Sequence, residues 1–161
     1  MEFEHLKAVL ERYAIDVKNA YQENLRDDGA IASGELINGV NYILDFKGTR
    51  FEVSLRLEEY WKYVEYGRKT KSKFPPPSAI RKWIEVKPIL PRPMKNGKLP
   101  TLEQLTYLIS RKIAEVGIRP RNVLANTLED INQEYDDKIS EALTQDLIDA
   151  VNEVFALIIK R

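Results

Sequence analysis

The stretch after Pro120 constrains the fold most, because it contains neither proline nor glycine up to the last residue, 161. Such a composition permits an uninterrupted helix, which at about 1.5 Å of rise per residue reaches up to about 55 Å. The sequence therefore predicts one long C-terminal helix or two collinear helices. A stripe this long exceeds what a small sheet can cover, so we expect it to pack on the first helix or on a neighbouring subunit. Its apolar residues, taken at three- and four-residue spacing, are Leu124, Leu128, Ile131, Tyr135, Ile139, Ala142, Leu147, Val151, Val154 and Ile158.

Two further patterns predict a helix and a hairpin in the first third of the chain. Apolar and aromatic residues recur every three or four positions from Phe3 to Tyr21, which predicts an amphipathic helix running to about Leu25. Two alternating segments, 40–46 and 51–57, flank Gly48-Thr49, and a two-residue loop with glycine first is typical of a type II′ turn. The cross-strand pairs expected on one face are Phe46–Phe51, Leu44–Val53 and Tyr42–Leu55.

Turn-forming residues mark three shorter helices between the hairpin and the last helix. Residues 58–66 are predicted to form a short helix capped by Gly67, with a strand as the alternative because aromatic residues also alternate there. Ser78 is the expected N-cap of a second helix, and Thr101 begins a capping box for a third helix that ends at Gly117. The apolar side expected for this third helix comprises Leu105, Leu108, Ile109, Ile113 and Val116.

Together these elements predict an α+β fold. A small antiparallel sheet built on the β-hairpin is expected to be packed by an N-terminal helix and a long C-terminal helix. A length of 161 residues predicts a single domain, 1–161. The basic, proline-rich stretch at about residues 68–100 is expected to be an exposed loop insertion in that domain.

Residue types that support catalysis and metal binding are scarce. There is no cysteine and a single histidine, His5, which excludes thiolate chemistry, disulfides and multi-histidine metal sites. No glycine-rich phosphate loop, Gly-x-Ser-x-Gly elbow or His-Glu-x-x-His motif occurs. No apolar run approaches the roughly 18 residues that a membrane-spanning helix needs. We therefore expect a protein that is not an enzyme, with no cofactor, no metal and no membrane partner.

Charge is unevenly distributed along a chain whose net charge is zero. Residues 68–98 hold ten Lys or Arg against one acid, whereas residues 127–161 hold nine acids against three bases. The basic segment has three interpretations: a solvated loop, a contact with nucleic-acid phosphates, or a docking surface for a protein partner. In the third, it faces an acidic helical side on the next subunit, and such head-to-tail contacts close into a ring when the rotation allows. That acidic side comprises Glu129, Asp130, Glu134, Asp137 and Glu141.

Two short motifs resemble those of bacteriophage neck and tail-completion proteins. The first is Tyr60-Trp61-Lys62-Tyr63-Val64-Glu65-Tyr66-Gly67, similar to a Tyr-x-x-x-Val-Glu-[Phe/Tyr]-Gly segment of that family, and the second is Gly117-Ile118-Arg119-Pro120. The proline-rich stretch and the helix after it resemble an insertion in a subset of members, so the likeness covers roughly residues 1–160. Two departures stand out. Arg68 follows Gly67 where many members have threonine or serine, and Arg121-Asn122 follow Pro120 where many have phenylalanine and a second proline.

This resemblance implies a structural virion protein of a tailed bacteriophage or prophage. Copies would form a ring at the head–tail junction or the upper tail end and complete the conduit for DNA. The implied partners are further copies of the chain, portal, connector or adaptor proteins, tail tube proteins and non-specific DNA. The implied location is the neck or tail of the virion, and the host cytoplasm during assembly. The alternative function is a small nucleic-acid-binding or regulatory protein that uses residues 68–98.

Specific residues are expected to make these contacts. Glu65 is a carboxylate among aromatic residues, which is costly to bury alone, so it is expected to accept backbone N–H groups or to pair with an arginine. The subunit or partner contacts expected besides the acidic side are Tyr63, Glu65, Tyr66, Arg68, Lys69, Lys71 and Lys73. The residues expected to contact DNA in the conduit are Lys71, Lys73, Lys95 and Lys98.

Overall fold

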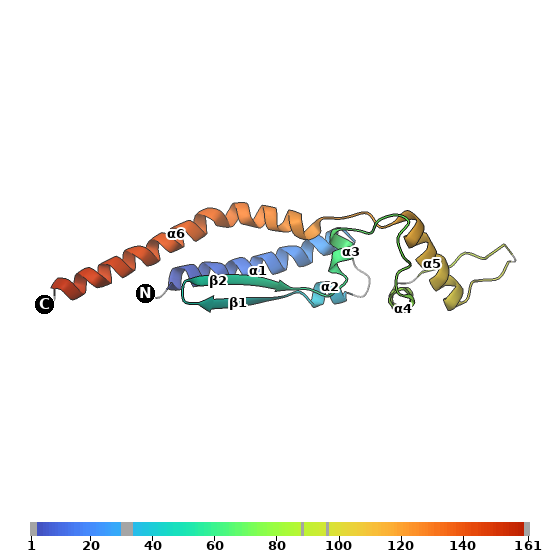
Figure 1. The fold of residues 1–161 in the computed structure, drawn as a ribbon, viewed down its shortest axis with the longest axis horizontal. Helices are drawn as coiled ribbons and strands as arrows, with labels where there is room; N and C mark the ends of the chain where they lie inside the picture. Colours follow the sequence, from blue (N-terminus) through green and yellow to red (C-terminus); the bar gives the residue numbers. More distant parts are fainter. Residues whose placement is uncertain (1–2, 30–33, 88, 96, 160–161) are drawn as a thin grey trace. The chain divides into compact units, whose positions relative to one another are not determined.

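The computed structural model describes residues 3–29, 34–87, 89–95 and 97–159. Figure 1 shows its elements, coloured from blue to red along the chain. They are α1 (Glu4–Asp27), α2 (Glu35–Asn38), β1 (Asn41–Lys47), β2 (Arg50–Arg56), α3 (Trp61–Glu65), α4 (Pro77–Val86), α5 (Leu102–Val116) and α6 (Val123–Ile159). Helices combined with an antiparallel hairpin confirm the predicted α+β class. The sequence predicted one domain, and the chain groups into two compact units. Unit 1 is Met1–Asn24, Val40–Arg56 and Leu124–Arg161, and unit 2 is Leu25–Gly39 and Leu57–Val123.

The hairpin of unit 1 has the predicted register. Its inward pairs are Phe46↔Phe51, Leu44↔Val53 and Tyr42↔Leu55, and all six side chains are half-buried. Gly48 has a φ of 61° whereas Thr49 has no positive φ, which is the combination that a type II′ turn requires. Within the described residues the sheet consists of β1 and β2 alone. The hairpin therefore needs a helix to cover its apolar face.

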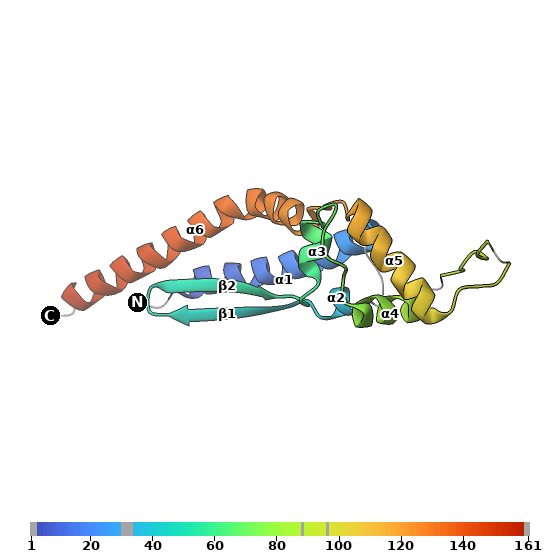
Figure 2. The ribbon, with the colours of Figure 1, turned by 45° about the vertical axis from the view of Figure 1, so that its right-hand side comes forward.

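Helix α1 supplies that cover and is the central layer of unit 1, lying between the hairpin and α6 (Figures 1 and 2). On the hairpin side, the ring of Phe3 meets the ring of Phe51 edge to face, with 5.2 Å between centroids. On the other side, Tyr13 meets Tyr135 of α6 edge to face at 5.3 Å. The predicted amphipathic helix is confirmed, and its buried residues are Leu6, Ala14, Val17, Tyr21 and Leu25.

Polar contacts reinforce the packing of α1 on α6. The phenol of Tyr135 donates a hydrogen bond to the carboxylate of Asp16, and Asn24 Nδ2 donates to Thr127 Oγ1 at 2.8 Å. Burial, together with the bond to Asp16, raises the pKa of Tyr135 well above its ordinary value of about 10. The phenol therefore remains protonated and keeps its role as donor over the whole neutral range.

Helix α6 is continuous over 37 residues, which is the first of the two predicted alternatives, but its apolar residues do not form one stripe. The series contains one step of five, from Ala142 to Leu147, and at about 100° per residue this step turns the series away from its earlier side. Tyr135 and Ala142 before the step are buried, whereas Leu147 and Val151 after it are exposed. The expectation of a single stripe is wrong, and only the first part of the series packs within unit 1.

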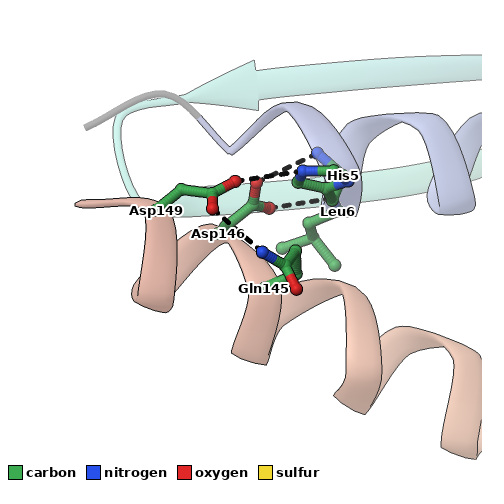
Figure 3. A network of polar contacts seen from close by, with 5 residues as sticks. All are labelled: His5, Leu6, Gln145, Asp146 and Asp149. Carbon is green, nitrogen blue, oxygen red and sulfur yellow. Dashed lines mark hydrogen bonds and ion pairs between the residues drawn. The ribbon is translucent and has the colours of Figure 1, made fainter. Parts of the chain in front are cut away.

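Asp146 connects α6 to the start of α1 (Figure 3). Its buried carboxylate accepts the main-chain N–H groups of His5 at 3.0 Å and of Leu6 at 2.9 Å. These donors belong to the first turn of α1, where N–H groups have no partner within their own helix. Asp146 therefore caps α1 from another helix and places a negative charge at the positive end of the α1 dipole. Beside this cap, the exposed side chains of His5 and Asp149 lie 3.2 Å apart.

Three helices of unit 2 follow the predicted positions with one correction. Residues 58–66 contain α3, a helix rather than the alternative strand. The capping role predicted for Ser78 is wrong, because α4 already begins at Pro77, which suits a first helical position since proline has no N–H to leave unpaired. The capping box of α5 is confirmed: Thr101 Oγ1 accepts the N–H of Gln104 at 3.3 Å, and Gln104 Oε1 accepts the N–H of Thr101 at 3.0 Å.

The buried face of α5 is made of small residues rather than the predicted apolar side. Its most buried positions are Thr106, Ser110 and Ala114, whereas Leu108 and Val116 are exposed and Leu105, Ile109 and Ile113 are half-buried. Small side chains let neighbouring main chain come close to a helix. The Ser72 N–H shows this, because it donates to the Ala114 carbonyl oxygen at 3.1 Å.

Replacing Asp146 by Asn tests the cap on α1. The substitution turns one acceptor oxygen into an NH2 group, so an N–H of the first turn loses its acceptor at a buried site. We expect the free energy of unfolding, measured in urea, to fall by about 1.5–3 kcal/mol, as for hydrogen bonds to charged groups. The matched control is Asp149→Asn on the same helix, which alters only exposed side-chain contacts with His5 and Gln145 and should change stability by less than about 0.5 kcal/mol. Equal losses in both variants would contradict the capping role.

Candidate interaction surfaces

The basic segment after Gly67 lies along the C-terminal turns of α5. Arg68 and Ile118 exchange two main-chain hydrogen bonds, of 2.8 Å from the Arg68 N–H and 2.9 Å from the Ile118 N–H. With the bond between Ser72 and Ala114, they tie the start of the segment to the end of α5. The sequence predicted an exposed loop, and many of its side chains are exposed, but its main chain is held by a neighbouring helix.

Two glycines make this close approach possible. Gly67 and Gly117 have φ values of 65° and 78°, a region that side-chain-bearing residues rarely adopt. A Cβ on Gly67 would lie 2.3 Å from the carbonyl oxygen of Ile118, and a Cβ on Gly117 would lie 2.3 Å from that of Arg68. Both obstacles are main-chain atoms, which cannot move aside as a flexible side chain does. Each glycine therefore leaves room for the main chain next to the other glycine. We name this close approach the glycine crossing.

The residues after this crossing wrap the end of α3. The N–H of Arg121 donates to the carbonyl oxygens of Val64 at 3.1 Å and Glu65 at 3.2 Å, and the N–H of Asn122 also donates to Glu65 at 3.2 Å. Asn122 has a φ of 53°, which asparagine tolerates better than most residues. The Arg121 guanidinium also pairs with the carboxylate of Asp28. Arg121-Asn122, a departure from the family pattern, thus has a definite structural role here.

Within the first motif, the structure separates the aromatic residues from the carboxylate. Tyr63 and Tyr66 are 48% and 68% exposed, and Tyr66 lies against the half-buried Trp61 with ring centroids 5.7 Å apart. Glu65 is 3% exposed, so the structure places it in the interior of unit 2. Of the three motif residues expected at a contact, the two tyrosines are therefore available at the surface and Glu65 is not.

Arg68 joins this motif to the basic segment. Its guanidinium lies 5.6 Å from the ring centroid of Tyr63, a cation–π geometry. Its Nε donates to Ser72 Oγ at 3.0 Å, and a terminal nitrogen donates to the carbonyl oxygen of Lys73. Arg68 is half-buried, and two of its side-chain nitrogens donate hydrogen bonds within the loop. It therefore shapes this surface more than it offers charge to a partner.

Aromatic and basic side chains that are mostly exposed follow one another along the segment beside α5 in unit 2. Lys69, Lys71 and Lys73 are exposed, and none of the three forms an ion pair with a residue that the structure describes. After them, the ring of Phe74 lies tilted against the ring of Tyr107 of α5, with 5.9 Å between centroids, and both rings are about half exposed. We name this surface the basic–aromatic strip, formed by Tyr63, Arg68, Lys69, Lys71, Lys73, Phe74 and Tyr107. Tyr107 was not predicted to belong to it, because it lies outside the apolar pattern of its helix.

The residues expected to contact DNA belong to two different segments. Lys71 and Lys73 lie beside the middle turns of α5, between the bond from Ser72 to Ala114 and the contact of Phe74 with Tyr107. Lys95 and Lys98 belong to a turn before the N-terminal end of α5, in which Met94 and Lys98 are joined by a 2.8 Å main-chain hydrogen bond. The two pairs are thus held differently, Lys71 and Lys73 by contacts with α5, and Lys95 and Lys98 by the turn that precedes this helix.

The acidic side predicted on the last helix is present on α6 in unit 1. All five residues, Glu129, Asp130, Glu134, Asp137 and Glu141, are exposed. Glu134 pairs with Lys138 at 2.6 Å, one turn along the helix, and the other four form no ion pair with the described part of the chain. An anionic helix side with little internal compensation is suited to a cationic partner.

Comparisons with known proteins and searches for other kinds of site add no further assignment. No family model, no curated protein and no solved structure matches this chain. Among the described residues, no group of three or more His, Cys, Asp or Glu side chains is placed to hold a metal ion. No helix within the described ranges is both long enough and apolar enough to span a membrane.

Replacing Gly67 by Ala tests the glycine crossing. The added methyl group would collide with main-chain atoms, so we expect unit 2 to lose about 3 kcal/mol or more of stability. Gly97→Ala is the matched control. Gly97 also has a positive φ, 75°, but nothing lies within 4 Å of its Cβ position, so only about 1 kcal/mol of backbone strain is expected. Chemical unfolding followed by circular dichroism measures both, and similar losses would show that φ alone, not close approach, requires glycine at position 67.

Proposed function

We propose that this chain is a structural subunit of a tailed bacteriophage or prophage virion. In this role it performs no catalysis, and copies assemble as a ring at the head–tail junction or the upper tail end to complete the conduit for DNA. The observation that carries the proposal is the crossing at Gly67 and Gly117. These glycines belong to the two motifs on which the family resemblance depends, and each requires the other for a physical reason. Two short matches far apart in the chain thus become one structural feature.

The charged surfaces support assembly between copies. The basic–aromatic strip belongs to unit 2 and the acidic side of α6 to unit 1, and both are exposed. Surfaces of opposite charge on different parts of one chain favour a heterologous contact, in which the strip of one copy meets the acidic side of the next. Tyr63, Phe74 and Tyr107 add apolar area, which such a contact needs because exposed charge pairs contribute little on their own.

The particle itself provides the direct test of this proposal. Mass spectrometry of purified, DNA-filled tailed particles from the source of the sequence should detect the chain at several copies per particle. A ring predicts a copy number that is fixed relative to the portal, so the ratio of the two proteins is the quantity to measure. Absence of the chain from clean particles, with the free protein present in the lysate, would contradict the structural role.

The alternative function, nucleic-acid binding through residues 68–98, is favoured by Lys69, Lys71 and Lys73, which form no ion pair within the described residues and lie near exposed aromatic rings. Binding through six or more phosphates would weaken roughly 1,000-fold or more between 50 and 200 mM salt. Under our proposal, duplex affinity is low, and the triple variant Lys69→Ala/Lys71→Ala/Lys73→Ala stays within about twofold of the unmodified protein. Fluorescence anisotropy with labelled duplex measures both quantities, and Lys95→Ala/Lys98→Ala serves as a comparison at the separate turn. A steep salt dependence that the triple variant abolishes would establish the alternative.

A further inference from the structure

The C-terminal turns of α6 carry an apolar face that the structure leaves uncovered. Its members lie between 46% and 82% exposed, and we name them the outer apolar face: Leu147, Ile148, Val151, Val154, Phe155, Ile158 and Ile159. Seven such side chains present several hundred Å² of apolar surface, at or above the roughly 300–600 Å² of the largest patch on a typical monomer. This amount approaches the roughly 800 Å² that each partner contributes to a standard protein interface.

The orientation of this face shows that α1 cannot cover it. Counted at about 100° per residue, the outer apolar face lies opposite the side on which Tyr135 and Asp146 contact α1. It continues instead the side of α6 that carries Asp137 and Glu141. The last turns of α6 also run past the N-terminal end of α1 (Figures 1 and 2). If these residues only continued the face that packs on α1, they would lie on the α1 side of the helix. They lie on the opposite side, so this face is suited to a different contact.

The chemistry of the face points to a second copy of the same segment. The two acids within these turns, Asp149 and Glu153, fall on the α1 side by the same count, so the outer face carries no charge. Two identical copies of it can therefore meet without like-charge repulsion. Leu147, Val151, Val154 and Ile158 follow steps of four, three and four, which is the spacing of a helix–helix packing seam.

Charge also determines the direction of this pairing. In a parallel arrangement the acidic stretch before residue 147, which lies on the same side of α6, would face its own copy and repel it. In an antiparallel arrangement only residues 147–159 overlap, and the two acidic stretches lie beyond opposite ends of the overlap. We infer that the C-terminal turns of α6 form an antiparallel, two-fold contact with the same turns of a second copy. This contact does not depend on the virion role, and it uses neither the basic–aromatic strip nor the acidic side.

Single cysteines provide a clean test, because the chain has none of its own. Val154 lies near the middle of the overlap, so Val154→Cys should form a disulfide between chains under mild oxidation at micromolar protein concentration. The matched control is Gln133→Cys, an exposed residue on the acidic part of the same side of α6, which should remain uncrosslinked. Equal crosslinking at both positions, or none at Val154→Cys, would overturn the inference.

Sedimentation equilibrium of the full chain provides a second and independent measurement. The unmodified protein should self-associate, and Val151→Asp/Phe155→Asp should raise its dissociation constant at least about 100-fold, because charge would be buried in the contact. Both residues are exposed, so circular dichroism and thermal unfolding of the variant should not change. The inference would be overturned if the unmodified protein stayed monomeric at about 100 µM, or if the variant associated as strongly as the unmodified protein. It would also be overturned by a monomer that binds phosphatidylcholine–phosphatidylglycerol vesicles through this face, which would indicate a lipid surface instead.

Discussion

Unit 2 depends on one close approach between main-chain segments. At Gly67 and Gly117 a side chain on either residue would overlap the carbonyl oxygen beside the other, so both positions are restricted together. The two hydrogen bonds between Arg68 and Ile118 form next to this point, and Arg121 reaches the end of α3 just after it. The exposed lysines and aromatic rings of the strip therefore start from a fixed main-chain anchor. Surfaces of this kind, held on a rigid base, bind with less loss of conformational freedom than an unattached loop.

Unit 1 depends on a different constraint, the limited length over which α1 and α6 run together. Thr127 and Asp146 lie near the two ends of this length: the first accepts a hydrogen bond from Asn24, the second caps the start of α1, and Tyr135 packs on Tyr13 between them. Beyond Asp146, α6 continues with its apolar side chains on the opposite side. A single helix thus serves two partners: α1 along its first part, and the surface that covers the outer apolar face along its second.

Local features of the fold were predictable from the sequence, whereas contacts between distant segments were not. The hairpin register, the type II′ turn and the capping box at Thr101 each depend on a few neighbouring residues, and each was predicted correctly. The cap from Asp146 could not be predicted, because its donors lie at the other end of the chain. The buried face of α5 was also missed, since small residues such as Ser110 and Ala114 are buried by close main-chain approach rather than by hydrophobicity.

The candidate surfaces illustrate the same limit in electrostatic terms. Composition describes residues 68–98 as one basic stretch, but several of its cations already have partners within the chain: Arg81 lies near Glu103, Lys82 pairs with Glu35, and Arg68 is held by Tyr63, Ser72 and the main chain of Lys73. A cation that is paired within the chain attracts an outside polyanion less strongly than a free one. A count of basic residues therefore overstates how strongly this chain can attract a polyanion at any single point. The basic–aromatic strip, which includes Tyr63 and Phe74, suits a protein surface of matching shape better than a long phosphate backbone. Strong binding to such a backbone needs many aligned contacts.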